Sequence, residues 1–340
     1  MMRLRRSTPY GAGIRRVRRG RGFSYTDENG VPVTDPEVTQ RIDALVIPPA
    51  WRKVWICPHA QGHIQAVGVD AAGRRQYLYH EQWRRERDEE KFDRMLEVAA
   101  QLPNLREQVS ADLRRSGSDR RRVEAVAIGL LDRGVFRIGG EEYAEENGTR
   151  GVATLLREQV RVSGEEMRFD YVAKGGIRRQ VRIVEPDLAR AVRSLRRNRS
   201  PSGRLLVYRE HRHSSELRSG DINARFKALV GDDHSAKDFR TWQATVLAAA
   251  GLAATECPNS QRRRNSAVRQ VMTEVAEALG NTPTVARNSY VDPRVIVAWE
   301  RGRTIAAASR RARRAPREDE RRAIVERAVL RLLRSTANGK

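Results

Sequence analysis

Three short stretches near the start of the chain mix apolar with polar residues in a strand-like pattern. The stretches "KVWICP", "GHIQAVGVD" and "RRQYLYH" are rich in β-branched and aromatic residues, and glycine, proline and aspartate separate them. Such runs predict β-strands. A charged stretch, "EQWRRERDEEKFDRMLEVAAQL", follows and predicts a helix. We therefore expect a β-rich N-terminal domain over residues 1–90.

Helical spacing dominates residues 91–340. After a polar cap at Ser118 and Asp119, apolar residues recur at i, i+3, i+4, i+7 and i+8. A second apolar series ends at Leu279, where a glycine can close the helix. Thr282 then predicts an N-cap with proline in the first helical position, so Tyr290 lies on the next helix or just past it. The C-terminal stretch "SRRARRAPREDERRAIVERAVLRLLRST" contains an amphipathic helix.

One β-hairpin interrupts the helices. In "MRFDYVAKGGIRRQVRI", apolar residues alternate along both arms, and Gly175-Gly176 forms the turn. The expected apolar positions are Phe169 and Tyr171 against Val181 and Ile183. Lys174 lies at the lip of this hairpin, where its side chain can reach a ligand. The predicted fold is α+β, with a small β-rich N-terminal domain and a larger, mainly α-helical domain that contains a small β-hairpin.

The excess of basic over acidic residues indicates which class of binding partner to expect. The chain has 340 residues, 39% of them hydrophobic, and 66 basic residues stand against 43 acidic ones for a net charge of +23. A field of this sign attracts polyanions, and nucleic acid gains affinity by counterion release. Residues 1–22 are a basic, glycine-punctuated arm, which is either a solvated tail or a strap along DNA phosphates.

The sequence gives little support to a membrane protein, a disulfide-rich protein, a zinc protein or a serine hydrolase. No run of about 18 apolar residues predicts a membrane span. Cys57 and Cys257 cannot form a disulfide framework, so a cytoplasmic, nucleoid-associated location is expected. A structural zinc site normally takes four ligands, and "CPHAQGH" offers three, namely Cys57, His59 and His63. In "HRHSSE", His211 and His213 lie beside a serine without a hydrolase elbow. We expect no metal and no cofactor.

A basic protein can act on a phosphodiester without a metal if a nucleophile reaches phosphorus among fixed donors. Tyr290 is the candidate nucleophile, although a phenol attacks weakly unless cations surround it. The candidate cations are Arg137 in "GVFRIGGEEY", Arg240 in "KDFRTW" and Lys174 in "YVAKGG".

These segments resemble a known family, the short bacterial and poxvirus type IB DNA topoisomerases. The resemblance covers nearly the whole chain, and its six segments follow in order. They are "RGRGFSYTDENG", "IPPAW", "VWICPHAQGHIQAVGVDAAGRRQYLYH", "FRIGGEEYAEENGTRGVATL", "AKDFRTW" and "GNTPTVARNSY". The resemblance implies a monomer with a DNA-clamping domain over residues 1–90 and a catalytic domain over residues 91–340. Such a protein relaxes supercoiled duplex DNA without ATP or metal.

The same resemblance implies roles for single residues. Tyr290 would form a 3′-phosphotyrosyl link and free a 5′-hydroxyl. Arg137 and Arg240 would bind the nonbridging oxygens, and Lys174 would protonate the leaving oxygen. Asn281 stands nine residues before the tyrosine, where the family usually has histidine, and its neutral amide can still donate one hydrogen bond.

In the N-terminal domain, the resemblance implies DNA contacts for Gln76, Tyr77 and Tyr79. Strand alternation would set the two tyrosines on one face. Gly140 replaces a lysine that contacts a base in the poxvirus relatives, so their sequence preference does not carry over to this chain.

Two alternatives stay open at this point. A tyrosine recombinase or integrase uses similar residues, but it usually has histidine where this chain has Lys237, and it lacks the "VWICP…QYLYH" domain. An architectural DNA-binding protein would need no ordered tyrosine segment.

Overall fold

The structure is a computed structural model that describes residues 3–134, 136–141, 144, 148–198, 201–211 and 213–337. The chain divides into two compact units, Met1–Lys91 and Phe92–Lys340, which we call the N-terminal and C-terminal units. Helix α2 (Glu81–Leu113) runs across the boundary. The predicted α+β class is confirmed. Along the described residues, no helix is long and apolar enough to cross a membrane.

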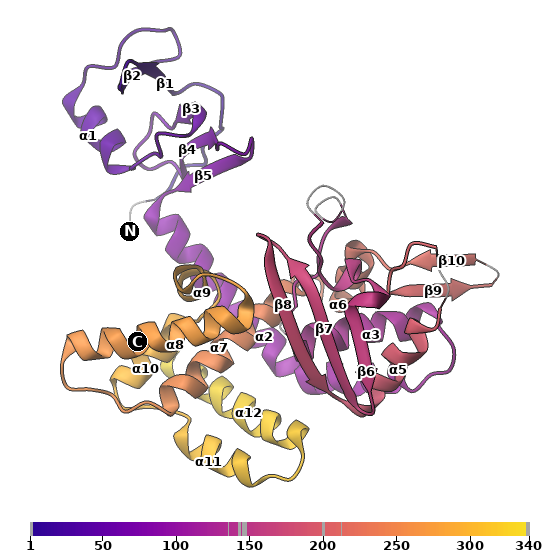
Figure 1. Ribbon diagram of the computed structural model, residues 1–340. Coiled ribbons are helices and arrows are strands. Elements are labelled where there is room, and N and C mark those ends of the chain that lie inside the picture. The colour runs from indigo at the N-terminus through magenta and orange to yellow at the C-terminus, as the bar shows by residue number, and fades with distance from the viewer. Residues whose placement is uncertain are drawn as a thin grey trace. The chain divides into compact units, whose positions relative to one another are not determined.

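The N-terminal unit is built on an antiparallel sheet with the strand order β2-β1-β3-β4-β5 (Figure 1). Its strands are β1 (Ile14–Arg19), β2 (Gly22–Thr26), β3 (Arg52–Ile56), β4 (Ile64–Val69) and β5 (Arg75–Tyr79). The last three match the three predicted stretches. Helix α1 (Pro36–Ala44) adds Ile42 to a core that includes Val54 and Ile56 of β3.

The expectation of a basic arm over residues 1–22 is wrong. Strand β1 lies inside the sheet, between β2 and β3. The residues before it also pack on the sheet: the backbone N–H of Ser7 donates to His63 Nδ1 at 2.9 Å, and Trp55 Nε1 donates to the carbonyl of Gly11 at 3.2 Å. The Ser7 hydroxyl lies 3.6 Å from Cys57 Sγ. These contacts give the cysteine and the histidine structural partners.

In the C-terminal unit, a three-stranded antiparallel sheet lies against helices α3 (Arg120–Gly134) and α5 (Pro186–Arg196). Its strands are β6 (Val160–Ser163), β7 (Glu166–Ala173) and β8 (Ile177–Val184). The predicted hairpin is the β7–β8 pair, in which Phe169 lies opposite Val181, while Tyr171 lies opposite Arg179. Two 3-10 turns, a second hairpin and a helix complete this part: Val152–Thr154, Arg157–Gln159, β9 (Val207–Glu210), β10 (His213–Glu216) and α6 (Ser219–Val230).

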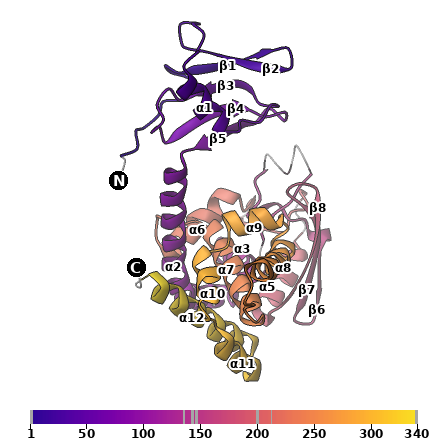
Figure 2. The ribbon, with the colours of Figure 1, turned by 90° about the vertical axis from the view of Figure 1, so that its left-hand side faces the viewer.

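The rest of the C-terminal unit is helical, and Figure 2 shows the helices grouped around α7. They are α7 (Lys237–Ala253), α8 (Gln261–Leu279), α9 (Pro283–Ser289), α10 (Pro293–Glu300), α11 (Ala306–Arg314) and α12 (Glu318–Ala337). Helix α7 buries Phe239 and Trp242 and packs against α8, α10, α11 and α12. The predicted boundary is confirmed: Gly280 ends α8 in the left-handed conformation, and Thr282 caps α9.

A buried ion network fixes the C-terminal helix to the core of its unit. Asp132 on α3 accepts hydrogen bonds from Arg106 of α2 and Arg322 of α12, and Glu326 of α12 also binds both arginines. Burial alone would raise the pKa of Asp132, but the arginine charges outweigh it and hold this pKa far below its ordinary range. The carboxylate is therefore ionised in the folded protein.

Replacing Asp132 with alanine should destabilise the C-terminal unit by about 3 kcal/mol, because it removes one of the two buried carboxylates that Arg106 and Arg322 share. The exposed pair Arg133–Asp319 gives the control, since Asp319→Ala should cost about 1 kcal/mol or less. Urea unfolding measures both. The folded pKa of Asp132 is depressed, so its contribution is present above the unfolded pKa of about 4 and is lost as the pH falls below it. Equal costs for the two variants would contradict this role.

Candidate active site

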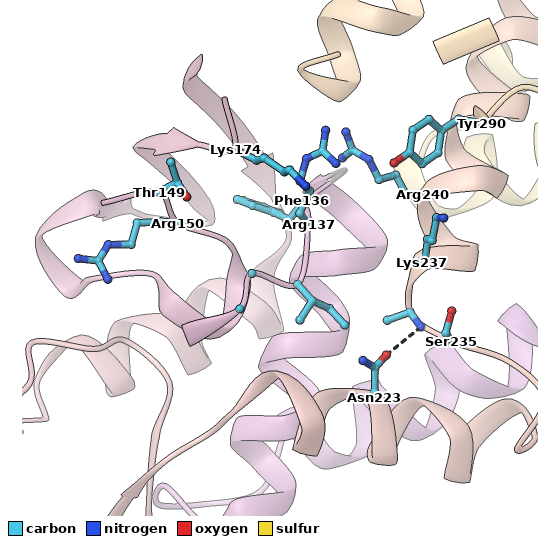
Figure 3. Close-up of a pocket in the computed structure, with 14 residues that line it drawn as sticks. Phe136, Arg137, Thr149, Arg150, Lys174, Asn223, Ser235, Lys237, Arg240 and Tyr290 are labelled. Carbon is cyan, nitrogen blue, oxygen red and sulfur yellow. Dashed lines mark hydrogen bonds between the residues drawn. The ribbon is translucent and has the colours of Figure 1, made fainter. Parts of the chain in front are cut away.

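A pocket of about 380 Å³ opens in the C-terminal unit. Figure 3 shows the cationic side chains beside it. Its described lining contains five cationic side chains and no carboxylate; the lining residues are Phe136, Arg137, Ile138, Gly139, Gly140, Thr149, Arg150, Lys174, Asn223, Ser235, Ala236, Lys237, Arg240 and Tyr290. An excess of one charge of this kind favours an anionic ligand.

Arg137 is positioned by a rigid segment after α3. Its neighbour Phe136 is buried and packs on the aromatic rings of β7. The carbonyl of Arg137 accepts a hydrogen bond of 2.9 Å from the N–H of Val152. Gly139 has φ +81°, and a Cβ there would lie 2.7 Å from the Cα of Gly151. The glycines of "FRIGG" therefore allow two backbone segments to touch and so fix the arginine.

Tyr290 stands at the C-cap of α9. Its N–H donates to the carbonyl of Ala286 at 3.1 Å, and its own carbonyl accepts from the Thr245 hydroxyl of α7 at 3.3 Å. The tyrosine is 8% exposed and still lines the pocket. The short helix between Thr282 and Tyr290 therefore sets the direction of the phenol.

Arg240 and Lys237 come from the first turn of α7. Residues at i and i+3 share a helix face, so both reach the pocket. The guanidinium carbon of Arg240 lies 5.3 Å from the centroid of the Tyr290 ring. The Arg240 guanidinium also donates to the carbonyl of Leu279, the last residue of α8.

Asn281 joins the site through Arg137, whose guanidinium donates to the amide oxygen of this asparagine. The Asn281 side-chain nitrogen is buried and has no hydrogen-bond partner among the described residues. Asn281 lines an adjacent groove rather than the pocket itself. Arg240 and Arg137 thus hold the residues on the two sides of the Gly280 turn.

Lys174 lies in the β7–β8 turn, closed by a 3.1 Å hydrogen bond from the N–H of Gly176 to the carbonyl of Ala173. In Figure 3 the side chains of Lys174, Arg137 and Arg240 converge on the side of the pocket that holds Tyr290, whereas Arg150 points away from them.

The nearby cationic side chains change the pKa of the Tyr290 phenol. Burial alone would raise the pKa of Tyr290, but the charges of Arg240, Arg137 and Lys237, with a hydrogen bond from Arg240, outweigh it and lower this pKa below 10. Burial, aided by repulsion from Arg137, lowers the pKa of Arg240 to about 10. The site therefore stabilises the phenolate form of Tyr290.

The structure brings together Arg137, Lys174, Arg240 and Tyr290 around one pocket, with Asn281 beside it. Lys237 was not predicted as a site residue. The sequence feature that could have identified Lys237 is its position three residues before Arg240 at the start of a helix, because this spacing puts both cations on one helix face.

The three predicted DNA contacts of the N-terminal unit do not share one face of β5. Tyr77 and Tyr79 are exposed and stacked, with ring centroids 6.0 Å apart. Gln76 lies on the opposite face by strand alternation, and its amide donates to Asp70 at 2.8 Å.

Candidate metal ligands are sparse. Across the described parts of the chain, no cluster of three or more His, Cys, Asp or Glu side chains could hold a metal ion. His211 and His213 lie at the β9–β10 hairpin, and neither lines the pocket.

Comparison with known proteins assigns the family. A model described as "Eukaryotic DNA topoisomerase I, catalytic core" matches residues 80–305, and one described as "Bacterial DNA topoisomerase IB, N-terminal domain" matches residues 22–70. The first range contains every residue of the pocket, whereas Gln76, Tyr77 and Tyr79 lie between the two ranges.

Individual proteins that are similar to this chain are also DNA topoisomerases. A DNA topoisomerase 1B of Acanthamoeba polyphaga mimivirus is 26% identical over 288 residues, which cover 82% of this chain and 85% of that protein. A DNA topoisomerase 1B of vaccinia virus (strain Copenhagen) is 27% identical over 168 residues, 45% of this chain and 51% of the relative. A DNA topoisomerase 1 of Daucus carota is 27% identical over 159 residues, 46% of this chain and 19% of the relative.

The catalytic-core match spans more than half of the chain and places it among the DNA topoisomerases. More specifically, the chain belongs to the type IB family, and it is therefore an isomerase.

The lowered pKa of Tyr290 can be measured directly. In free enzyme labelled with [13Cζ]tyrosine, the resonance missing from Tyr290→Phe should titrate below pH 10, because nearby cations stabilise the phenolate. Lys237→Met should raise that midpoint, since it removes one of these charges. Arg150→Met removes a cation that points away and should leave the midpoint nearly unchanged. An unaltered midpoint in Lys237→Met would contradict the electrostatic account.

Proposed function

We propose that the protein relaxes supercoiled duplex DNA by cutting and resealing one strand through Tyr290. The phenol oxygen attacks a backbone phosphorus, the bond to the 5′ oxygen breaks, and the 3′ phosphate remains on the tyrosine. The duplex then swivels about the intact strand. The freed 5′-hydroxyl reverses the reaction, and the phosphotyrosyl bond conserves the phosphodiester energy, so ATP and metal are not needed.

One observation carries this proposal: a buried phenol with a lowered pKa faces a pocket whose described lining holds cations and no carboxylate. Negative charge grows on the nonbridging oxygens in the transition state. Fixed guanidinium groups stabilise that charge more than they stabilise the ground state, which is the condition for faster reaction. Arg137 and Arg240 take this role.

Asn281 adds a neutral donor. Its oxygen is occupied by Arg137, so its unpartnered nitrogen is the atom available to a phosphoryl oxygen. An amide gives a hydrogen bond without adding a charge, and its contribution is smaller than that of a cationic imidazolium.

Lys174 is the proton donor for the leaving oxygen. In Figure 3 the Lys174 and Tyr290 side chains lie on either side of the Arg137 and Arg240 guanidinium groups, which suits a lysine that meets the departing atom while the phenol meets the other face of phosphorus. In-line displacement places the attacking and leaving oxygens on opposite sides.

The substrate is double-stranded DNA, contacted by both units of a monomer associated with the nucleoid in the cytoplasm. In the N-terminal unit, the exposed pair Tyr77 and Tyr79 presents aromatic faces to the duplex. Gln76 reaches a base only if it leaves Asp70. A recombinase is less favoured, because both matched families are topoisomerases.

Plasmid relaxation in EDTA without ATP tests the function. Wild-type protein should relax negatively and positively supercoiled plasmid alike. Tyr290→Phe should lose all detectable relaxation while it keeps DNA affinity, because only the attacking oxygen is removed. Relaxation by Tyr290→Phe, or a requirement for metal, would overturn the mechanism. Catenated or exchanged products would instead favour recombination.

Replacing Lys174 with alanine tests the proton donor separately. Cleavage should slow by about 10²–10⁴-fold, the usual contribution of a general acid. A substrate with sulfur in place of the leaving 5′ oxygen should restore most of that rate, because a thiolate leaves without a proton. Arg137→Ala gives the contrast, since its loss should not be rescued by sulfur. If sulfur fails to rescue Lys174→Ala, the lysine has another role.

A further inference from the structure

The segment that carries Tyr290 continues into a buried ion pair. Two residues beyond the tyrosine, Asp292 is 0% exposed. Arg294 donates from Nε to both oxygens of its carboxylate at 3.0 Å and from Nη2 to Oδ2 at 2.8 Å. The backbone N–H of Arg294 also donates to Oδ1 at 2.9 Å, so Asp292 caps helix α10 as well. Neither residue lines the catalytic pocket.

A helix cap alone does not account for this pair. A cap needs one acceptor for the free N–H groups of the first turn, and asparagine serves about as well as aspartate. At the start of α10, one guanidinium binds both oxygens of a carboxylate inside the protein. Burying such a pair costs solvation, and apolar residues often give equal or greater stability. The pair therefore points to a need for fixed geometry at this place in the chain.

The backbone between Tyr290 and Asp292 is also held by α7. The Thr245 hydroxyl donates to the carbonyl of Tyr290 at 3.3 Å and accepts from the N–H of Asp292 at 3.1 Å. Val291, the one residue between the C-cap of α9 and the N-cap of α10, is 1% exposed. A shift of Asp292 therefore moves the backbone of Tyr290, and the phenol moves with it.

Arg294 joins this pair to a distant segment of the C-terminal unit. Its Nη1 donates to Oδ1 of Asp93 on α2 at 2.9 Å, so one guanidinium binds two carboxylates that lie 199 and 201 residues apart from one another and from the arginine in the chain. Burial alone would lower the pKa of Arg294, but the hydrogen bonds and charges of Asp292 and Asp93 outweigh it and raise this pKa. Val295 and Trp299 are buried and anchor α10 itself.

We propose that the Asp292–Arg294 ion pair is a positioning element for the nucleophile, which holds the Tyr290 phenol in line with the phosphorus before cleavage. The inference rests on the proposed function, since it takes Tyr290 as the attacking group. Both residues act through the backbone that they fix, because neither of them lines the pocket.

Such a role affects the two directions of the reaction unequally. Before cleavage, a phenol on a loosened backbone can turn away from the phosphorus, and orienting it costs conformational entropy. After cleavage, the bond to phosphorus holds the tyrosine, and the cations of the pocket hold the phosphate. Loss of the ion pair should therefore slow cleavage, leave religation nearly unchanged and shift the equilibrium toward uncut DNA.

Single-turnover kinetics on a short duplex with one mapped cleavage site test this role. Cleavage at saturating DNA, religation from the covalent complex and DNA affinity are measured for R294M. The matched control is R225M, since Arg225 of α6 is also largely buried, binds Asp112 of α2 at 2.9 Å and does not line the pocket. Thermal melting checks that each variant is folded.

Cleavage by R294M should be about ten- to hundredfold slower, because a misplaced reacting group has an effect of this size. Religation and DNA affinity should each stay within about twofold of wild type. D292N keeps a capping side chain but loses the charge, and it should show the same pattern. R294K keeps the charge without the planar fork, and its cleavage rate should be intermediate. If R294M does not fold, D292N and R294K carry the test.

The controls separate positioning from other roles. R225M should keep both rate constants of wild type, whereas Arg137→Ala, which removes a proposed phosphate contact, should slow cleavage and religation alike. A role in stability alone would lower the melting temperature and the fraction of active enzyme and leave the rate constants unchanged.

The proposal is overturned if the rate constants of R294M and D292N equal those of wild type, if R294M slows religation as much as cleavage, or if R225M shows the same selective loss. Failure of wild type to form a covalent complex, or cleavage by Tyr290→Phe, is a different result, which would refute the proposed function itself.

Discussion

A cluster of like charges beside a buried phenol is the constraint on which the site depends. Arg137, Lys237 and Arg240 lie close enough to lower the pKa of Tyr290, and repulsion from Arg137 also lowers that of Arg240. No carboxylate among the described lining residues neutralises them. The two arginines are held instead by neutral oxygens, the carbonyl of Leu279 and the amide of Asn281. In the proposed function, a phosphate of the substrate relieves the repulsion between these cations.

The fold supplies the rigidity that such a cluster needs. A local backbone structure positions each functional side chain. The contact between Gly139 and Gly151 positions Arg137, a three-residue turn positions Lys174, and a short capped helix positions Tyr290. These elements pack on one hydrophobic core of the C-terminal unit. Preorganised charges need not reorient as the reaction proceeds, so their attraction acts fully on the transition state.

Local signals in the sequence predicted the elements that carry the site. The sequence around Gly280, Thr282 and Pro283 indicated both helix boundaries because capping depends on near neighbours, and Gly175-Gly176 indicated the hairpin turn for the same reason. The meeting of Arg137, Lys174, Arg240 and Tyr290 joins distant segments, and only the family resemblance anticipated it.

The sequence is least informative where contacts between distant segments determine the structure. The basic start of the chain suggested a free arm, yet Ile14 and Trp55 draw it into the sheet. Strand alternation sets Tyr77 and Tyr79 on one face of β5, as predicted, and the DNA contact predicted for Gln76, which bonds to Asp70 on the other face, stays a prediction. The C-terminal stretch expected to contain an amphipathic helix holds two helices, α11 and α12, divided near Pro316.

The central claim is that Tyr290 supplies the attacking oxygen in the covalent step, and the resulting bond can be observed. Cleavage reactions on a duplex labelled at either end would be stopped with detergent, and the DNA-linked peptide identified by mass spectrometry. We predict a single adduct in which Tyr290 carries the 3′ phosphate of the cut strand, with a 5′-hydroxyl on the other fragment. An adduct on another residue, or on a 5′ phosphate, would contradict the account.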